Sequence, residues 1–231
     1  MAVDTNANTQ NNNTEAPAWM AHGDEIYAAI RPHAKLRFVK ANDIILNQDE
    51  AVTHLYFMIK GTADGFAYSE SGTKFWVTEF NAGDIIGQAE IFASHKMGYE
   101  ITAHSNVEML VLPASAFLAM LERQNKLGIK VAENLSRSLQ NVQARLVEMA
   151  IMPASARVCA ELLRLSKPIG KTPDQRIVRP HPVYSNLALR VHSTRETVSR
   201  SISELEKMGI VKRSTGSIII LKPDALKRSA S

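Results

Sequence analysis

The stretch STRETVSR, residues 193–200, predicts the start of a helix with one packed face and one open face. Ser193 and Glu196 have the spacing of a capping box, in which the two side chains accept backbone N–H groups of the first turn. At about 100° per residue, apolar and polar side chains fall on opposite arcs. The apolar arc holds Val198, Ile202 and Leu205, and the polar arc holds Arg195, Glu196, Ser199, Arg200 and Ser203. Taken alone, this pattern also fits an ordinary amphipathic helix with a solvated face.

The flanking segments favour a DNA-reading unit over that simpler interpretation. Residues 187–191 predict a short helix, and His192 follows where a tight turn would join it to the next helix. Residues 208–211 and 218–221 predict two short strands around a turn that contains Gly216. Arginine can donate two hydrogen bonds to guanine, and glutamate can accept one from cytosine. The order helix, turn, helix and wing therefore places base-reading chemistry on the polar arc.

The segments RETVSR (195–200) and LEKMGI (205–210) resemble the recognition helix and wing of the cyclic-AMP receptor protein/Fnr (Crp/Fnr) family of bacterial transcription regulators. The resemblance implies a set of DNA-binding residues: Arg195, Glu196 and Arg200 as base readers, with Thr194, Ser199 and Ser185 beside them. His192 stands where that family usually has glycine in the turn, and Arg190 stands where its first helix usually has an aliphatic residue. Histidine is among the residues that tolerate positive φ, so we expect the turn to form.

Charge is divided unequally along the chain. Residues 154–231 contain 15 Lys and Arg and 6 Asp and Glu, a net charge of +9, whereas residues 1–153 carry a net charge of −5. A basic C-terminal part is expected if only that part meets phosphate. The single cysteine, Cys159, excludes an intrachain disulfide and a cysteine-based metal or iron–sulfur site, and is predicted to be a buried thiol. No apolar run is long enough to span a bilayer and no secretory signal is visible, so a cytoplasmic protein without a membrane partner is expected.

Short β-rich runs, separated by turn residues, fill the chain from about residue 34 to residue 112. They predict strands at 36–39, 43–46, 54–60, 63–69, 75–80, 84–86, 99–103 and 108–112. Strands spaced this evenly favour an antiparallel sandwich or small barrel. The segments LYFMIKG (55–61) and NAGDIIG (81–87) resemble the jelly-roll cyclic-nucleotide-binding domain, so the resemblance covers both ends of the chain.

The resemblance implies an effector pocket, but this chain departs from the cyclic-AMP pattern in it. The corresponding pocket positions are Gly87, Gln88, Ala89, Lys96, Met97, Gly98, Val142 and Gln143. Gln88 replaces the glutamate that binds ribose, and no Arg-Ser or Arg-Thr pair stands at 96–98. A lysine point charge does not reproduce the two-bond clamp of arginine on phosphate. We therefore expect one of three arrangements. An effector other than cyclic AMP, such as another cyclic mono- or dinucleotide, binds in the pocket; the protein binds DNA without any effector; or occupancy of the pocket inhibits DNA binding.

The segment from about residue 115 to residue 151 predicts a long helical region. Leu135, Leu139, Val142, Leu146 and Met149 recur at steps of four, three, four and three residues. This heptad seam predicts either a parallel helix pair in a homodimer or packing on the chain's own β domain.

These patterns predict an α+β protein with a disordered tail (1–18), a jelly-roll cyclic-nucleotide-binding-like domain (19–114), a dimerisation helix (115–152) and a winged helix-turn-helix domain (153–231) whose last residues, from Lys222, are loosely ordered. The predicted function is a homodimeric regulator on a palindromic double-stranded operator, with RNA polymerase as a further partner if it activates. The alternative is a small-molecule-binding module that docks to another protein. No catalytic or metal-ligand constellation is visible, so an enzyme is not expected.

Overall fold

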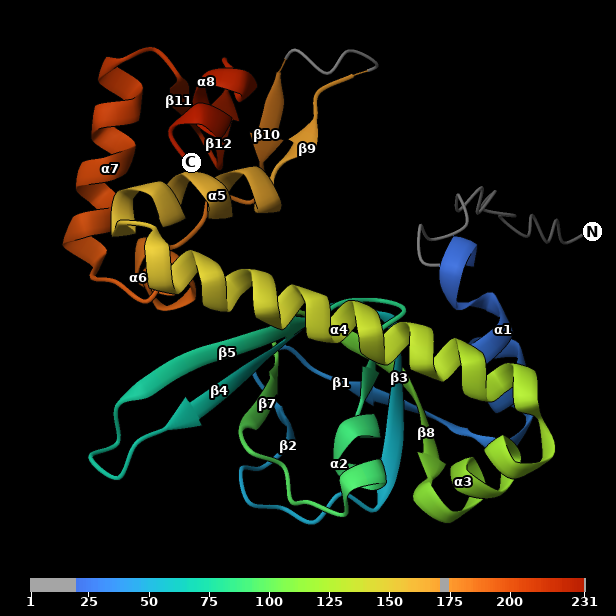
Figure 1. The fold of residues 1–231 in the computed structure, drawn as a ribbon. Coiled ribbons are helices and arrows are strands. Elements are labelled where there is room, and N and C mark those ends of the chain that lie inside the picture. The colour runs from blue at the N-terminus through green and yellow to red at the C-terminus, as the bar shows by residue number, and fades with distance from the viewer. Residues whose placement is uncertain (1–19, 171–174, 231) are drawn as a thin grey trace, which may run out of the picture.

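The structure, a computed structural model, describes residues 20–170 and 175–230. It has an N-terminal β-rich part and a C-terminal part, with the long helix α4 (Asn125–Ile151) running between them (Figure 1). The predicted tail at residues 1–18 lies outside the described residues. Within the described ranges, every helix is too short or too polar to cross a membrane.

Eight strands of the N-terminal part form two antiparallel four-stranded sheets, with strand orders β1-β8-β3-β6 and β2-β7-β4-β5. The strands are β1 (Lys35–Val39), β2 (Ile44–Leu46), β3 (His54–Lys60), β4 (Ala63–Tyr68), β5 (Lys74–Phe80), β6 (Ile85–Ile86), β7 (Glu100–Ala103) and β8 (Val107–Pro113). Each of these eight strands is among those predicted, and each end lies within one residue of the prediction. The observed strands and helices confirm the α+β class. The strands could be predicted because side-chain alternation and turn residues determine them locally.

Strand β3 separates two apolar cores because its side chains alternate between the two faces of the sheet. Tyr56 and Met58 belong to the core between the two sheets. Leu55 and Phe57 belong to the core between this sheet and the helices on its outer face. Those helices are α1 (Met20–Ile30), which continues into the 3₁₀ turn η1 (Arg31–His33), α3 (Ala114–Arg123) and the first half of α4.

The helical region predicted from residue 115 to residue 151 is two helices, α3 and α4, separated at Gln124. Gln124 has φ −131° and ψ 84°, outside the helical range. Both helices pack on one core, α3 through Phe117 and α4 through Leu127 and Val131. The chain changes direction between the two helices, and both still contact this core (Figure 1).

The C-terminal part packs four helices against a small antiparallel sheet of order β11-β12-β10-β9. The elements are α5 (Ala154–Leu165), β9 (Lys167–Pro168), β10 (Arg176–Val178), α6 (Tyr184–Arg190), α7 (Arg195–Lys207), β11 (Val211–Ser214), β12 (Ser217–Ile220) and α8 (Pro223–Arg228). The expectation of a loosely ordered segment from Lys222 is wrong for residues 223–228, because α8 buries Leu226 in this core. Cys159 is buried as predicted, and burial raises the pKa of its thiol to about 11.

Candidate DNA-binding surface and effector pocket

A tight turn joins α6 to α7, as the sequence predicts. His192 adopts φ 47°, the left-handed conformation that usually favours glycine. The Ser193 N–H donates to the carbonyl of Ala188 at 2.9 Å, and the His192 N–H donates to the carbonyl of Leu189 at 3.2 Å. These bonds satisfy carbonyl groups at the end of α6. Histidine therefore replaces glycine in this turn without loss of the turn's hydrogen bonds.

Arg157 of α5 forms hydrogen bonds to the backbone of the same turn. Its guanidinium donates Nε to the carbonyl of Val191 at 2.9 Å and Nη2 to the carbonyl of His192 at 3.3 Å. Its Nη1 donates to the carbonyl of Met152, in the link between α4 and α5, at 2.6 Å. One cation thus joins the turn between α6 and α7 to the link that follows α4.

The predicted N-cap of α7 is wrong by one residue. The helix begins at Arg195, and Thr194 is the cap, because its hydroxyl accepts the Thr197 N–H at 3.2 Å. Ser193 stays in the turn, where its backbone bonds to the end of α6. The pKa of Glu196 is lowered by a hydrogen bond from its own backbone N–H and by one from the Thr194 side chain, so this carboxylate stays ionised at the start of α7.

The two faces of α7 are separated as predicted. Val198, Ile202 and Leu205 are buried in the C-terminal core. The predicted base-reading residues Arg195, Glu196 and Arg200 are all exposed on the opposite face. Ser199 lies partly buried beside them, and Ser185 is exposed in the first turn of α6. Arg195, Glu196 and Arg200 therefore share one accessible face of α7, and Ser185 is exposed on the neighbouring helix α6.

Strands β11 and β12 form the predicted wing, with Gly216 at φ 73° in the turn between them. The first strand, predicted at 208–211, begins three residues later, because Met208 and Gly209 form the turn that ends α7. Glu206 of α7 accepts two hydrogen bonds from Arg213 of β11, from its backbone N–H at 3.0 Å and from Nε at 2.7 Å. The hydrogen bonds from Arg213 lower the pKa of Glu206. The wing is thereby held against the end of α7, while Lys212 remains exposed.

The predicted effector cassette begins at Gly87 and continues into α2 (Gln88–Ala93). Gly87 has φ 91°, and a Cβ there would lie 2.8 Å from Cγ1 of Val52, so only glycine fits. Gln88 is buried and turned toward α4, where its Nε2 donates to Oδ1 of Asn134 at 2.8 Å. Its Oε1 has no hydrogen-bond partner among the described residues.

Side chains of the segment after α2 pack in the apolar core between the two sheets. Met97 is 1% exposed and packs in the core between the two sheets, with Tyr99 against the same core. The Tyr99 ring lies over Gly65, where a Cβ would come within 2.8 Å of the ring. Burial raises the pKa of Tyr99. Lys96 and Gly98, on either side of Met97, are exposed.

A cavity of about 1320 Å³ lies between the cassette, α4 and the C-terminal part. It brings together four of the predicted pocket residues, namely Gly87, Gln88, Ala89 and Val142. It does not bring in the other four: Lys96, Met97, Gly98 and Gln143 do not line it. Met97 lies instead in the core between the two sheets, so the predicted pocket positions and this cavity coincide only in part. In the part of the chain that the structure describes, no cluster of three His, Cys, Asp or Glu could hold a metal ion.

The predicted seam on α4 is mostly open in the single chain. Leu139, Val142, Leu146 and Met149 are between 45% and 64% exposed. Leu135 differs, because it packs partly buried on the helix-facing core. Four of the five seam residues therefore form an apolar stripe on the second half of α4.

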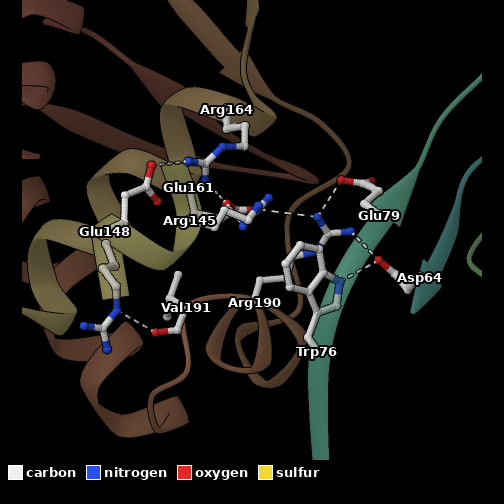
Figure 2. Close-up of polar contacts among 10 residues, drawn as sticks. Asp64, Trp76, Glu79, Arg145, Glu148, Glu161, Arg164, Arg190 and Val191 are labelled. Atoms are coloured by element: carbon white, nitrogen blue, oxygen red, sulfur yellow. Dashed lines mark hydrogen bonds and ion pairs between the residues drawn. The ribbon is translucent and has the colours of Figure 1, made fainter. Parts of the chain in front are cut away.

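Arg190, the unusual residue of the first helix, joins the two parts of the protein (Figure 2). It is buried, with Nη2 2.9 Å from Oδ1 of Asp64 on β4 and Nη1 2.7 Å from Oε2 of Glu79 on β5. Glu161 of α5 lies 3.4 Å from the same Nη1. Burial opposes the charged form of Arg190, but the hydrogen bond and charge of Glu79, with the other two carboxylates, raise its pKa.

Aromatic and basic side chains complete this interdomain polar cluster. The Trp76 indole N–H donates to Oδ1 of Asp64 at 2.8 Å, and the Arg145 guanidinium lies 4.3 Å from the ring centre of Trp76. On its other side, Arg145 lies 3.4 Å from Glu161. Arg164 pairs with Glu161 and, at 2.7 Å, with Glu148 of α4. The cluster therefore ties α4, α5 and α6 to the sheet that contains β4 and β5.

Comparison with known proteins agrees with this architecture. Residues 36–124 match the cyclic nucleotide-binding domain family, and residues 156–229 match the Crp-like helix-turn-helix domain family. The cAMP-activated global transcriptional regulator CRP of Pasteurella multocida is 23% identical over 191 residues, which cover 81% of this chain and 90% of that protein. This pair of domains defines a class of regulators in which a cyclic nucleotide-binding fold is joined to a helix-turn-helix DNA-binding domain.

Solved structures share the fold at low sequence identity. FixK2 from Bradyrhizobium japonicum has a TM-score of 0.74 at 16% identity, covering 86% of this chain and 98% of its own. The c-di-GMP responsive global regulator CLP of Xanthomonas campestris has a TM-score of 0.72 at 15% identity, covering 85% and 98%. This chain belongs to the Crp/Fnr family of DNA-binding transcription regulators.

Sequence reasoning missed three functional-site features. Arg190 had a visible signal, a charged residue at an aliphatic position of a helix, but its partners lie more than 100 residues away on β4 and β5. Arg157 as a clamp on the turn had no local signal, because its acceptors are backbone carbonyls. The Gln88–Asn134 bond joins residues 46 positions apart and likewise had none.

Proposed function

We propose that this protein is a homodimer that binds a palindromic DNA operator through the exposed face of α7. One observation carries the proposal: Arg195, Glu196 and Arg200 lie exposed on one face of a helix whose other face is fixed in the core. Bidentate arginine–guanine pairs and glutamate–cytosine contacts specify bases. Thr194, Ser199 and Ser185 complete this surface, and Lys212 on the wing supplies contacts to phosphate.

The proposed dimer forms along the open stripe of α4. A row of apolar side chains at heptad spacing, about half exposed, is typical of one side of a two-helix coiled coil. A twofold axis parallel to the pair would place two α7 helices on successive major grooves, about 34–36 Å apart. This geometry accounts for an operator with inverted half-sites.

The proposed effector, if the protein uses one, is not cyclic AMP. The family pattern needs a cation for the cyclic phosphate inside the roll, and Met97 fills that position in the apolar core. The residues present therefore do not fit cyclic AMP in the family's manner. Another cyclic mono- or dinucleotide is the proposed class, since CLP, which shares the fold, is described as c-di-GMP responsive. RNA polymerase is proposed as the partner if the protein activates transcription.

The proposal is tested by selecting DNA from a random pool with the purified protein, in the absence of nucleotide and with cyclic AMP or cyclic dinucleotides added separately. We expect one enriched palindrome and no effect of cyclic AMP on its enrichment. A palindrome that appears only with cyclic AMP would overturn the effector proposal. A pool that yields no enriched sequence would overturn the DNA-binding proposal and favour docking to another protein.

A further inference from the structure

The guanidinium of Arg190 is held from two sides at once. Asp64 and Glu79 come from the N-terminal sheet, whereas Glu161 comes from α5 in the same part of the chain as Arg190. A planar guanidinium can engage separate carboxylates with its two terminal nitrogens, and an ammonium group cannot reproduce that fork. Arg190 therefore bridges two folding units.

One of the two receiving carboxylates, Asp64, also contacts side chains of the N-terminal part itself. Asp64 accepts the Trp76 indole N–H at 2.8 Å and lies 3.0 Å from Nδ1 of His104. The Asp64 side chain is about 93% buried. Trp76 and His104 therefore help to orient this carboxylate toward Arg190.

The contact does not cover the DNA-reading surface. Arg190 lies on the buried side of α6, while Arg195, Glu196 and Arg200 on α7 remain exposed. Only a four-residue turn, clamped by Arg157, separates Arg190 from α7. Fixing the end of α6 against β4 and β5 therefore also fixes the direction of α7 relative to α4.

We infer that Arg190 is a positioning residue, whose bridge to Asp64 and Glu79 sets the distance between the two recognition helices of the dimer. This inference rests on the proposed dimeric function. With the bridge intact, both α7 helices are held in one orientation, and one half-site spacing is preferred. Without it, the contacts of Arg145, Arg157 and Arg164 still hold the C-terminal part to α4, but α6 is no longer fixed to β4 and β5 through Arg190, so the orientation of α7 varies more and several spacings become acceptable.

The test uses the double variant Asp64→Asn with Glu79→Gln, which removes both carboxylate charges from the bridge and leaves the Arg190–Glu161 contact in place. The matched control is Glu100→Gln with Glu108→Gln, which removes the same charge from the N-terminal part without touching Arg190. Binding is measured to the selected operator and to operators with one or two base pairs added or removed at the centre. We expect the wild-type preference for one spacing to fall at least tenfold in the double variant and to persist in the control.

Single half-site binding and the outcomes of the spacing assay distinguish failure of the positioning role from failure of the proposed function. Binding to a single half-site should be unchanged in the double variant, because the reading residues are intact. An unchanged spacing preference in a folded double variant would overturn the positioning role while leaving the proposed function in place. Absence of any palindromic preference in the wild type would instead overturn the proposed function. If the double variant does not fold, Arg190→Lys keeps the charge without the fork and should show the same relaxed spacing.

A DNA-independent measurement addresses the bridge directly. Spin labels at Ser71, in the exposed β4–β5 turn, and Lys207, at the exposed end of α7, report the orientation of the two parts in one subunit when diluted with unlabelled protein. Cys159 is replaced by alanine in this background. A narrow distance distribution that broadens in the double variant supports the inference. Equal widths in both proteins would overturn it.

Discussion

Gln88 donates its side-chain amide to Oδ1 of Asn134 at 2.8 Å, and both residues are buried. This bond links the first residue of the cassette helix α2 to the middle of α4. In the family pattern, the corresponding position carries a ribose-binding glutamate, whereas here it is used to hold one element of the chain to another. The cassette is therefore mechanically connected to the helix that carries the proposed dimer seam.

Substitution of a proposed base-reading residue should change DNA preference more than overall affinity. Arg195→Ala should flatten the preference at one symmetric pair of operator positions, because each good bidentate contact is worth about 1–3 kcal/mol of discrimination. Competition binding against operators changed at each position measures this effect. Lys212→Ala is the control, and should weaken all sequences to a similar degree. Retention of the full sequence preference by Arg195→Ala would contradict the assignment.

A charge in the α4 stripe should separate the proposed dimer. Leu146→Glu places two carboxylates at the apolar seam, where their burial is unfavourable. Sedimentation velocity should show a shift from dimer to monomer, with a corresponding loss of binding to the palindrome. Ile129→Glu is the matched control, since Ile129 is 60% exposed on the same helix but lies outside the seam. A dimer that survives Leu146→Glu would place the interface elsewhere.

The His104–Asp64 pair should make stability depend on pH. The hydrogen bond to Asp64 raises the pKa of His104, while the charge of Arg190 opposes this and that of Glu79 adds to it. Because the folded-state pKa is raised, the stabilisation is complete below the unfolded value of about 6.5 and disappears as pH rises through the folded value.

Urea unfolding of His104→Gln at pH 5.5 and pH 8.5 measures this contribution. The variant should lose more stability relative to wild type at pH 5.5, by no more than about 1 kcal/mol because His104 is half exposed and screened. His95→Gln, at an exposed loop position, provides the control. A deficit of the same size at both pH values would show that His104 acts through packing alone.

Truncation of the buried Met97 side chain should lower the free energy of unfolding. Met97→Ala deletes a fully buried side chain and should lower the free energy of unfolding by about 2–5 kcal/mol. Lys96→Ala, at the exposed neighbour, should change it by no more than about 0.5 kcal/mol. Chemical denaturation of the two variants gives the comparison. Similar values for both would mean that Met97 is not a core residue and that the roll has room for a ligand.

Much of the fold could be predicted because it depends on local patterns. Alternating side chains and turn residues determined all eight strands of the N-terminal part, and the two faces of α7 followed from helical periodicity. The bend at Gln124 and the helix α8 were missed, since both depend on burial of side chains against distant elements. Thr194 rather than Ser193 caps α7, because the Ser193 backbone N–H is hydrogen-bonded to the end of α6 within the turn. Local sequence cannot distinguish two adjacent hydroxyl residues that compete for one cap.

The candidate DNA-binding surface was more predictable than the effector pocket. A recognition helix carries its reading residues within one short segment, whereas the pocket is assembled from segments far apart in the chain. Met97 illustrates the difference, because its neighbours in sequence are exposed and only the opposing sheet explains its burial. The partners of Arg190 were likewise hidden by their separation in the sequence.

The unequal division of charge gives the molecule an electrical polarity, with +9 in residues 154–231 and −5 in residues 1–153. Near a DNA duplex, the phosphate field attracts one end of the protein and repels the other, so the molecule experiences a torque before any contact forms. The C-terminal part is therefore turned toward the DNA as the protein approaches, and a larger fraction of encounters is productive. Since added salt screens that field over about 10 Å at 0.1 M, the rate of association should fall with ionic strength even where the final contacts are unchanged.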